Sequence, residues 1–139
     1  MDFLSAMKIS ASGLSAERTR VNLATSNLAN AESTRGPDGE LYRRLDPVLS
    51  AESFDQTLSA SPQPQGVNVV EVVQDAGPGR RVYSPGHPDA DADGFVTFPN
   101  VNPIHEVVNL MSASKAYEAN ATSVETLKSM ATRALDIAR

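Results

Sequence analysis

The stretch from Asn102 to Arg139 constrains the fold of this chain more than any other feature. After Pro103 it runs for about 35 residues without another proline or any glycine. Asn102 can accept hydrogen bonds from the free N–H groups of a first helical turn, and proline suits the first helical position because it needs no N–H there. The sequence therefore predicts one helix of roughly 50 Å, longer than the usual helix of a globular domain.

Apolar residues recur every seven positions along this predicted helix. Two lines share the repeat: Leu110, Tyr117, Val124, Ala131 and Ala138, and beside them Ala113, Asn120, Leu127 and Ala134. A heptad repeat predicts a coiled-coil seam, with an ordinary long surface helix packed on its own domain as the alternative. The seam is rich in alanine, so a partner helix can come close while each contact buries little. A buried Asn120 would fix the register of the pair.

A second heptad pattern covers residues 3–30. Its members are Met7, Leu14, Val21 and Leu28, flanked by Leu4, Ala11 and Ala24. Gly13 and several serines and threonines weaken the helix propensity, so this helix depends on packing. Asn30 is a suitable stop because asparagine tolerates the left-handed conformation. We expect the two seams to pair, and we expect other copies of the chain to cover them, since two thin seams bury too little surface alone.

Residues 31–101 are expected to form a loop- and β-rich insertion. Turn residues gather at Arg35–Gly39, and a Ser-, Pro- and Gln-rich mobile loop is predicted at Asp55–Gly66. Short strands are predicted at Glu40–Leu45, Gly66–Val73, Arg80–Tyr83 and Gly94–Phe98. The second and third of these should form a hairpin across Asp75–Gly79. The predicted fold class is α+β, with terminal helices (1–30 and 102–139) paired as a coiled coil around the insertion (31–101).

Composition and charge exclude several classes of function. The net charge of −5 argues against a nucleic-acid partner and against binding to an anionic membrane surface. The absence of cysteine removes disulfides, thiol chemistry and cysteine-type zinc sites. Met1–Lys8 lacks the apolar segment of a cleaved signal peptide, and no run approaches transmembrane length. Two small basic spots, Arg43–Arg44 and Arg80–Arg81, are expected to meet acidic faces of neighbouring subunits.

The segment Asp89–Gly94 resembles the first half of an EF-hand loop. It supplies carboxylates at alternate positions, from Asp89, Asp91 and Asp93, followed by a glycine. Asn100 stands where the bidentate glutamate is needed, and prolines on both sides oppose the flanking helices. We therefore expect a polar turn between two extended segments, with aspartates bonding local N–H groups, and no metal. A calcium-binding module outside the cytoplasm is the rival hypothesis, which a calcium titration would test.

No catalytic constellation stands out. His87 and His105 are the only histidines, and their spacing is not that of metal ligands. Ser84, His87 and Asp89 are the residue types of a catalytic triad, but the chain has no Gly-x-Ser-x-Gly elbow. We expect no enzyme activity, no cofactor and no small-molecule substrate.

Three parts of the sequence resemble bacterial flagellar rod and hook proteins. They are Ser12–Arg18 with Asn27–Thr34, His87–Val96 with Pro99–Asn102, and Glu106–Met111 with Ser114–Asn120, Lys128–Met130 and Ala134–Ile137. The Asp-rich turn and the short middle are similar to the proximal rod members of that family rather than to distal rod or hook proteins. The resemblance implies a structural subunit without enzyme activity or metal.

The same resemblance implies where the protein works and with what. It implies a flagellar basal-body rod that crosses the periplasm and transmits torque, built from copies of this chain, other proximal and distal rod subunits and a rod-base adaptor. It also implies export by the flagellar type III apparatus without a cleaved signal peptide. The expected assembly seam is Met7, Leu14, Val21, Leu28, Leu110, Tyr117, Asn120, Val124 and Leu127. A self-contained helical adaptor, with both terminal helices formed in the monomer, is the second rival.

Overall fold

The fold is a pair of long helices flanked by two small antiparallel sheets. The computed structural model describes residues 3–36, 39–52 and 66–137. Its elements in chain order are α1 (Phe3–Ala29), β1 (Leu45–Glu52), β2 (Gly66–Gln74), β3 (Arg80–Tyr83), β4 (Phe95–Phe98) and α2 (Pro103–Ile137). The α+β class is confirmed, with helices at both ends and strands between them. The predicted loop at 55–65, the Pro37–Asp38 part of the predicted turn, and Ala138 of the heptad lie outside the described residues.

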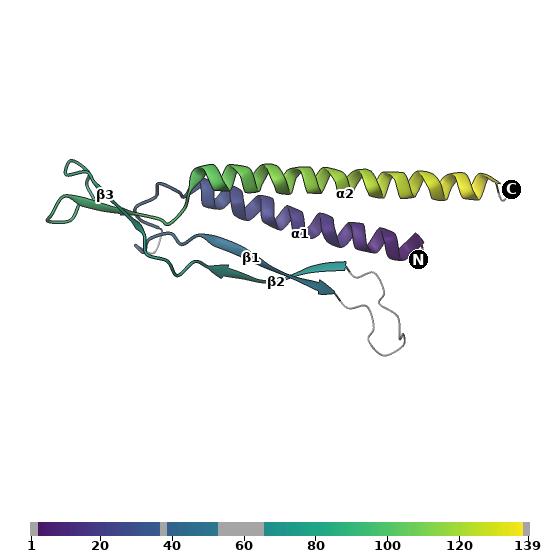
Figure 1. Ribbon diagram of the computed structural model, residues 1–139, viewed down its shortest axis with the longest axis horizontal. Coiled ribbons are helices and arrows are strands. Elements are labelled where there is room, and N and C mark those ends of the chain that lie inside the picture. Colours follow the sequence, from purple (N-terminus) through teal and green to yellow (C-terminus); the bar gives the residue numbers. More distant parts are fainter. Residues whose placement is uncertain (1–2, 37–38, 53–65, 138–139) are drawn as a thin grey trace.

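The helices run antiparallel and side by side (Figure 1). The β1–β2 hairpin packs along α1, on the side away from α2, while the β3–β4 hairpin lies beyond the end where α1 stops and α2 starts. The C-terminal end of α2 extends past the N-terminal end of α1. None of the helices in the described part of the chain is long and apolar enough to cross a membrane.

Both predicted helix boundaries are confirmed. The side chain of Asn102 caps α2, because its Oδ1 accepts hydrogen bonds from the N–H of Ile104 at 3.0 Å and of His105 at 3.4 Å. At the other boundary, α1 ends at Ala29, and the Asn30 N–H still donates to the Ser26 carbonyl at 3.1 Å before the chain turns.

The first sheet starts later than predicted. Strand β1 begins at Leu45, paired with Gln74, and 40–44 form no ladder, so the prediction of a strand over Glu40–Leu45 is wrong. The reason is that Tyr42 and Arg44 turn their side chains into polar contacts with the helices, described below. The sheet is tied to α1 by the Val67 N–H, which donates to the Ser12 hydroxyl at 3.1 Å.

The predicted hairpin across Asp75–Gly79 is also wrong. Strand β2 pairs with β1 and β3 pairs with β4, so this turn carries the chain from one sheet to the other. The Asp75 carboxylate accepts the Gly77 N–H at 2.7 Å, and Pro78 has no N–H for a ladder. A Cβ on Gly79 would lie 2.6 Å from the Phe98 carbonyl oxygen, so glycine allows the chain to run close to β4.

The Asp-rich segment is the turn that closes the β3–β4 hairpin. The Ser84 N–H donates to the Gly94 carbonyl and the Asp91 N–H to the Phe95 carbonyl, both at 2.8 Å. Gly94 has a φ of 79°, which a residue with a Cβ adopts with strain. The expected polar turn between two extended segments is therefore confirmed.

The apolar core is small. Its buried hydrophobic side chains are Ala16, Ala24, Ala31, Val96, Val101 and Ala113. The buried alanines of the two helices are Ala16 and Ala24 in α1 and Ala113 in α2. Because alanine buries little apolar area, this interface gains little from the hydrophobic effect.

Candidate functional site

The helix pair has a defined register. The Asn27 Nδ2 of α1 donates to Glu106 Oε2 of α2 at 3.2 Å, and a Cβ on Gly13 would lie 2.9 Å from the Asn120 Nδ2. Asn27 and Gly13 are 14 residues apart, and so are Glu106 and Asn120. The helices therefore keep step over two heptads, and the same register continued by seven residues would bring Leu127 level with Ala6–Met7. Gly13, which weakens helix propensity, lets α2 approach closely at this point.

The predicted seam residues remain partly open to solvent. Those that are half-buried are Met7, Leu14, Val21, Leu28, Leu110, Asn120, Val124 and Leu127. Tyr117 is 39% exposed. Of the seam, Asn120 has a defined neighbour on the opposite helix, and that neighbour is Gly13 rather than the adjacent Leu14. Pairing of the remaining seam residues stays a prediction.

A buried carboxylate lies where the two helices meet at one end. Glu106, in the first turn of α2, is 1% exposed. Its Oε1 accepts a hydrogen bond from Arg44 Nε at 2.7 Å, and its Oε2 accepts one from Asn27. Arg44 also pairs with Asp46. Burial opposes the charge of Arg44, but the hydrogen bond to Glu106 and the charges of Asp46 and Glu106 outweigh it and raise the guanidinium pKa above its ordinary value.

Asn27 joins this carboxylate to the start of β1. Its Nδ2 also donates to the Leu45 carbonyl, and its Oδ1 accepts from the Leu45 N–H and the Tyr42 hydroxyl, each at 2.9 Å. The Tyr42 hydroxyl lies 3.2 Å from that of Ser26. Asn27 is 1% exposed. Its amide donates two hydrogen bonds through Nδ2 and accepts two through Oδ1, so the buried group is fully satisfied. We call Asn27, Arg44 and Glu106 the junction cluster.

The junction cluster contradicts one sequence-based expectation. Arg44 was expected to meet an acidic face of a neighbouring subunit, but its partners Glu106 and Asp46 belong to the same chain. Arg81 likewise pairs with Asp91 at 2.7 Å. The rings of β4 attract the second basic spot, with the Arg81 guanidinium 4.8 Å from the Phe95 ring centroid.

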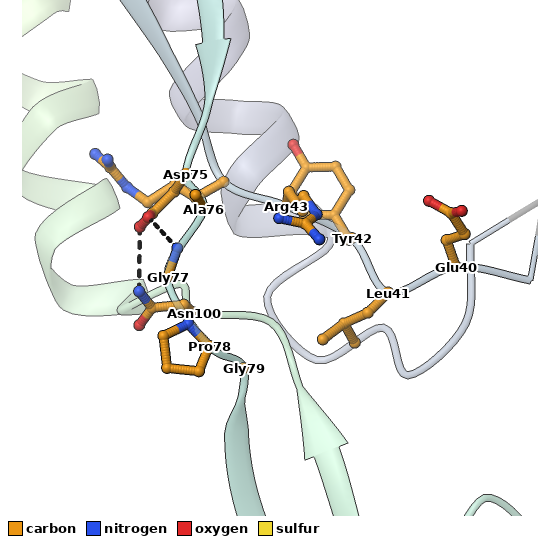
Figure 2. A pocket seen from close by; sticks show the side chains of 11 residues that line it. Glu40, Leu41, Tyr42, Arg43, Asp75, Ala76, Gly77, Pro78, Gly79 and Asn100 are labelled. Atoms are coloured by element: carbon orange, nitrogen blue, oxygen red, sulfur yellow. Dashed lines mark hydrogen bonds between the residues drawn. The ribbon is translucent and has the colours of Figure 1, made fainter.

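A depression of about 390 Å³ adjoins the cluster. It lies between 40–44 and 75–79, with Asn100 at its edge (Figure 2). Figure 2 shows Asp75 using both carboxylate oxygens, one on the Gly77 N–H and the other on Asn100 Nδ2 at 3.1 Å. These bonds hold the segment that connects β2 to β3. We therefore interpret the depression as part of the connection between the two sheets and not as a binding site.

The candidate metal and triad residues serve the hairpin turn. Asp89 accepts from the Thr34 hydroxyl at 2.7 Å and pairs with Arg35 at 2.6 Å, which ties the turn to the segment after α1. His87 Nδ1 accepts a hydrogen bond from the Asp89 backbone N–H at 3.1 Å. In a catalytic triad the histidine would instead donate to the aspartate carboxylate, so these residues do not form one. Within 3–36, 39–52 and 66–137, no group of three or more potential ligands could hold a metal ion.

The hydrogen bonds of Asp91 predict a turn that is sensitive to acid. The Phe95 N–H, which donates to Asp91 Oδ1 at 2.8 Å, is the main reason that its pKa lies below the ordinary value, with further help from Arg81 and the Asp93 N–H. Because the folded pKa is lower than the unfolded one, the bonds stabilise the turn above about pH 4. That stabilisation should disappear as the pH falls through the folded pKa.

We expect an acid titration followed by NMR to show the Phe95 amide losing its hydrogen-bonded shift. The shift should change as the Asp91 carboxylate becomes protonated, and Asp91→Asn should abolish this pH dependence. Asp93→Asn is the control, because the Asp93 contact comes from its backbone N–H. A Phe95 amide that responds identically in both variants would contradict the assignment.

Exposed apolar side chains gather at both ends of α2. Near its start they are Ile104, Val107, Val108 and Met111, and near its end Met130, Leu135 and Ile137. Ile104 is 73% exposed and Ile137 is 87% exposed. Positions 104, 107, 108 and 111 follow the spacing of one helix face. Clustered apolar side chains left in water mark a surface for association.

Comparison with known proteins points to one family. The family model described as "Flagella basal body rod protein" matches residues 7–37, and the model described as "Flagellar basal body rod FlgEFG protein C-terminal" matches residues 92–137. The chain is 41% identical to the flagellar basal-body rod protein FlgC of Escherichia coli O157:H7 and to that of Salmonella typhimurium, over 99% of this chain and 98% of each relative. It is 38% identical to FlgC of Bacillus subtilis, over 96% of each chain.

Proposed function

This chain belongs to the flagellar basal-body rod protein family of FlgC, and we propose that it polymerises through its terminal helices into the proximal part of the rod. Membership makes it a structural rod subunit that assembles with other flagellar rod components, and not an enzyme. The observation that carries the proposal is the resemblance to FlgC over nearly the whole length of both chains.

The helix pair supports the proposed mode of assembly. Eight of the nine seam residues are half-buried, so each retains apolar or amide surface for a further helix. In the rod, we expect the seam of residues 1–30 and 102–139 to pack as a coiled coil and to form the inner layers of a helical tube. The insertion, residues 31–101, would lie outside and lock neighbouring subunits. Torque would then pass through many small contacts in parallel.

The proposed role also specifies which proteins the chain would contact in the rod. They are other copies of the chain, proximal and distal rod subunits, and a rod-base adaptor. The rod would cross the periplasm, and the chain would reach it through the flagellar type III export apparatus without a cleaved signal peptide. The thin, alanine-rich helix interface suits a chain that is exported unfolded and orders on assembly.

Deleting the gene in the source bacterium tests the proposed function. We expect cells that do not swim and basal bodies that end before the proximal rod in electron micrographs. A plasmid copy of the intact gene should restore both. The matched control is a plasmid copy carrying a stop codon early in the gene. Complete rods in the deletion strain would contradict the proposal.

A further inference from the structure

The apolar contacts between α1 and α2 do not by themselves specify one register. Buried contact positions are occupied by small residues such as Ala16, Ala24 and Ala113. Both helices repeat their apolar residues every seven positions, so sliding one helix by seven residues brings similar side chains together again. A register therefore needs a contact that is lost on such a slip.

The junction cluster is such a contact, and the close approach of Asn120 to Gly13 is a second one, which the cysteine variants below replace. Glu106 lies against Asn27, and both are 1% exposed. A slip of seven residues in one direction would set Ala113 against Asn27. The Asn27 amide and the Arg44 guanidinium would then lose the carboxylate that satisfies them. Buried polar groups without partners are strongly destabilising, and this holds most for charged groups.

We propose that Asn27, Arg44 and Glu106 set the register of α1 against α2. The three residues come from α1, from the segment before β1 and from α2, so the cluster closes only when all three segments are in position. Asn27 also bonds both backbone groups of Leu45, which couples the register of the helices to the start of the β1–β2 sheet. In the rod, a role that rests on the proposed function, one register would give every subunit the same outer surface.

Disulfide trapping can read the register, because the natural chain has no cysteine. A Cβ on Gly13 would lie 3.2 Å from the Asn120 Cγ. A disulfide requires roughly 3 Å between a Cβ and the partner's sulfur. The double variant Gly13→Cys/Asn120→Cys therefore reports the observed register. Two further variants, Gly13→Cys/Ala113→Cys and Gly13→Cys/Leu127→Cys, report slips of seven residues in either direction.

The purified full chain is oxidised mildly, and disulfides are quantified by mass spectrometry of peptides. With the cluster intact, we expect the 13–120 disulfide to exceed the two slipped disulfides at least tenfold. Adding Arg44→Leu/Glu106→Leu should reduce the 13–120 yield several-fold and raise at least one slipped product. The control Glu17→Leu/Arg20→Leu removes an ion pair of 2.9 Å within α1, and it should leave the yields unchanged.

Circular dichroism decides which variant is informative. Where Arg44→Leu/Glu106→Leu lacks helix, Glu106→Gln replaces it, since the amide keeps the shape of Glu106 while it removes the charge. An intact-cluster chain without a 13–120 disulfide would overturn the proposal. So would folded cluster variants that keep the full yield. Motility does not enter this measurement, so its outcome is independent of the rod function.

Discussion

Replacing Glu106 with alanine should lower the free energy of unfolding of the full chain by about 3 kcal/mol. The substitution leaves the Asn27 amide and the Arg44 guanidinium without the carboxylate that both contact. Removal of one partner of a buried ion pair typically costs about 3–5 kcal/mol. We expect the lower end, because the Arg44 side chain is 22% exposed and retains Asp46 as a partner. Urea unfolding followed by circular dichroism measures the change.

Two variants separate charge from position in this experiment. Glu106→Gln keeps one acceptor oxygen but loses the second, because its NH2 group would face a donor. It should therefore lose about 1.5–2 kcal/mol, the lower part of the range for a single hydrogen bond to a charged group. Glu118→Ala removes an exposed glutamate from the same helix and should change stability by less than about 0.5 kcal/mol. If Glu106→Ala is as mild as Glu118→Ala, the cluster does not stabilise the fold.

The sequence predicts the helices well because their signals are local. Asn102 and Pro103 specify the start of α2 within two residues, and the heptad repeat gives its length. The end of α1 near Asn30 follows from the same kind of signal. The Asp-rich turn was also predictable, since aspartates bond N–H groups two to four residues away, as Asp91 does with Asp93 and Phe95.

The parts that sequence reasoning missed depend on contacts between distant segments. Glu106 lies in the first turn of α2, where the helix dipole favours a negative charge, and it also lies seven residues before Ala113 on the same seam line. That spacing was a signal that it faces α1. Asn27 and Arg44 lie far from it in sequence, and no local rule links the three. The prediction of strand pairing was wrong for a similar reason. The turn residues at Asp75–Gly79 indicate that the chain bends, but they do not specify which two strands pair.

Leu127→Asp should abolish rod assembly while the chain is still made and exported. Leu127 is half-buried, and the register set by the Asn27–Glu106 and Gly13–Asn120 contacts, continued by seven residues, would bring it level with Ala6–Met7. An aspartate there must give up hydration against α1 or against a neighbouring helix, and an unpaired charge at an apolar contact is costly. Truncating a fully buried leucine costs about 2–5 kcal/mol, and the added charge should bring a half-buried site into that range. In the proposed rod this contact would recur in every subunit, so the cost would be incurred at each one.

The measurement uses the deletion strain described above, complemented with the variant gene. We expect normal amounts of the chain in cells and in the exported fraction, no rods in electron micrographs and no swimming. Thr126→Asp is the matched control, since it adds the same charge one residue away on the exposed face of α2. Motile cells with normal rods carrying Leu127→Asp would remove the seam as the basis of assembly. Equal defects in both variants would assign the effect to added charge anywhere on α2 and not to the seam.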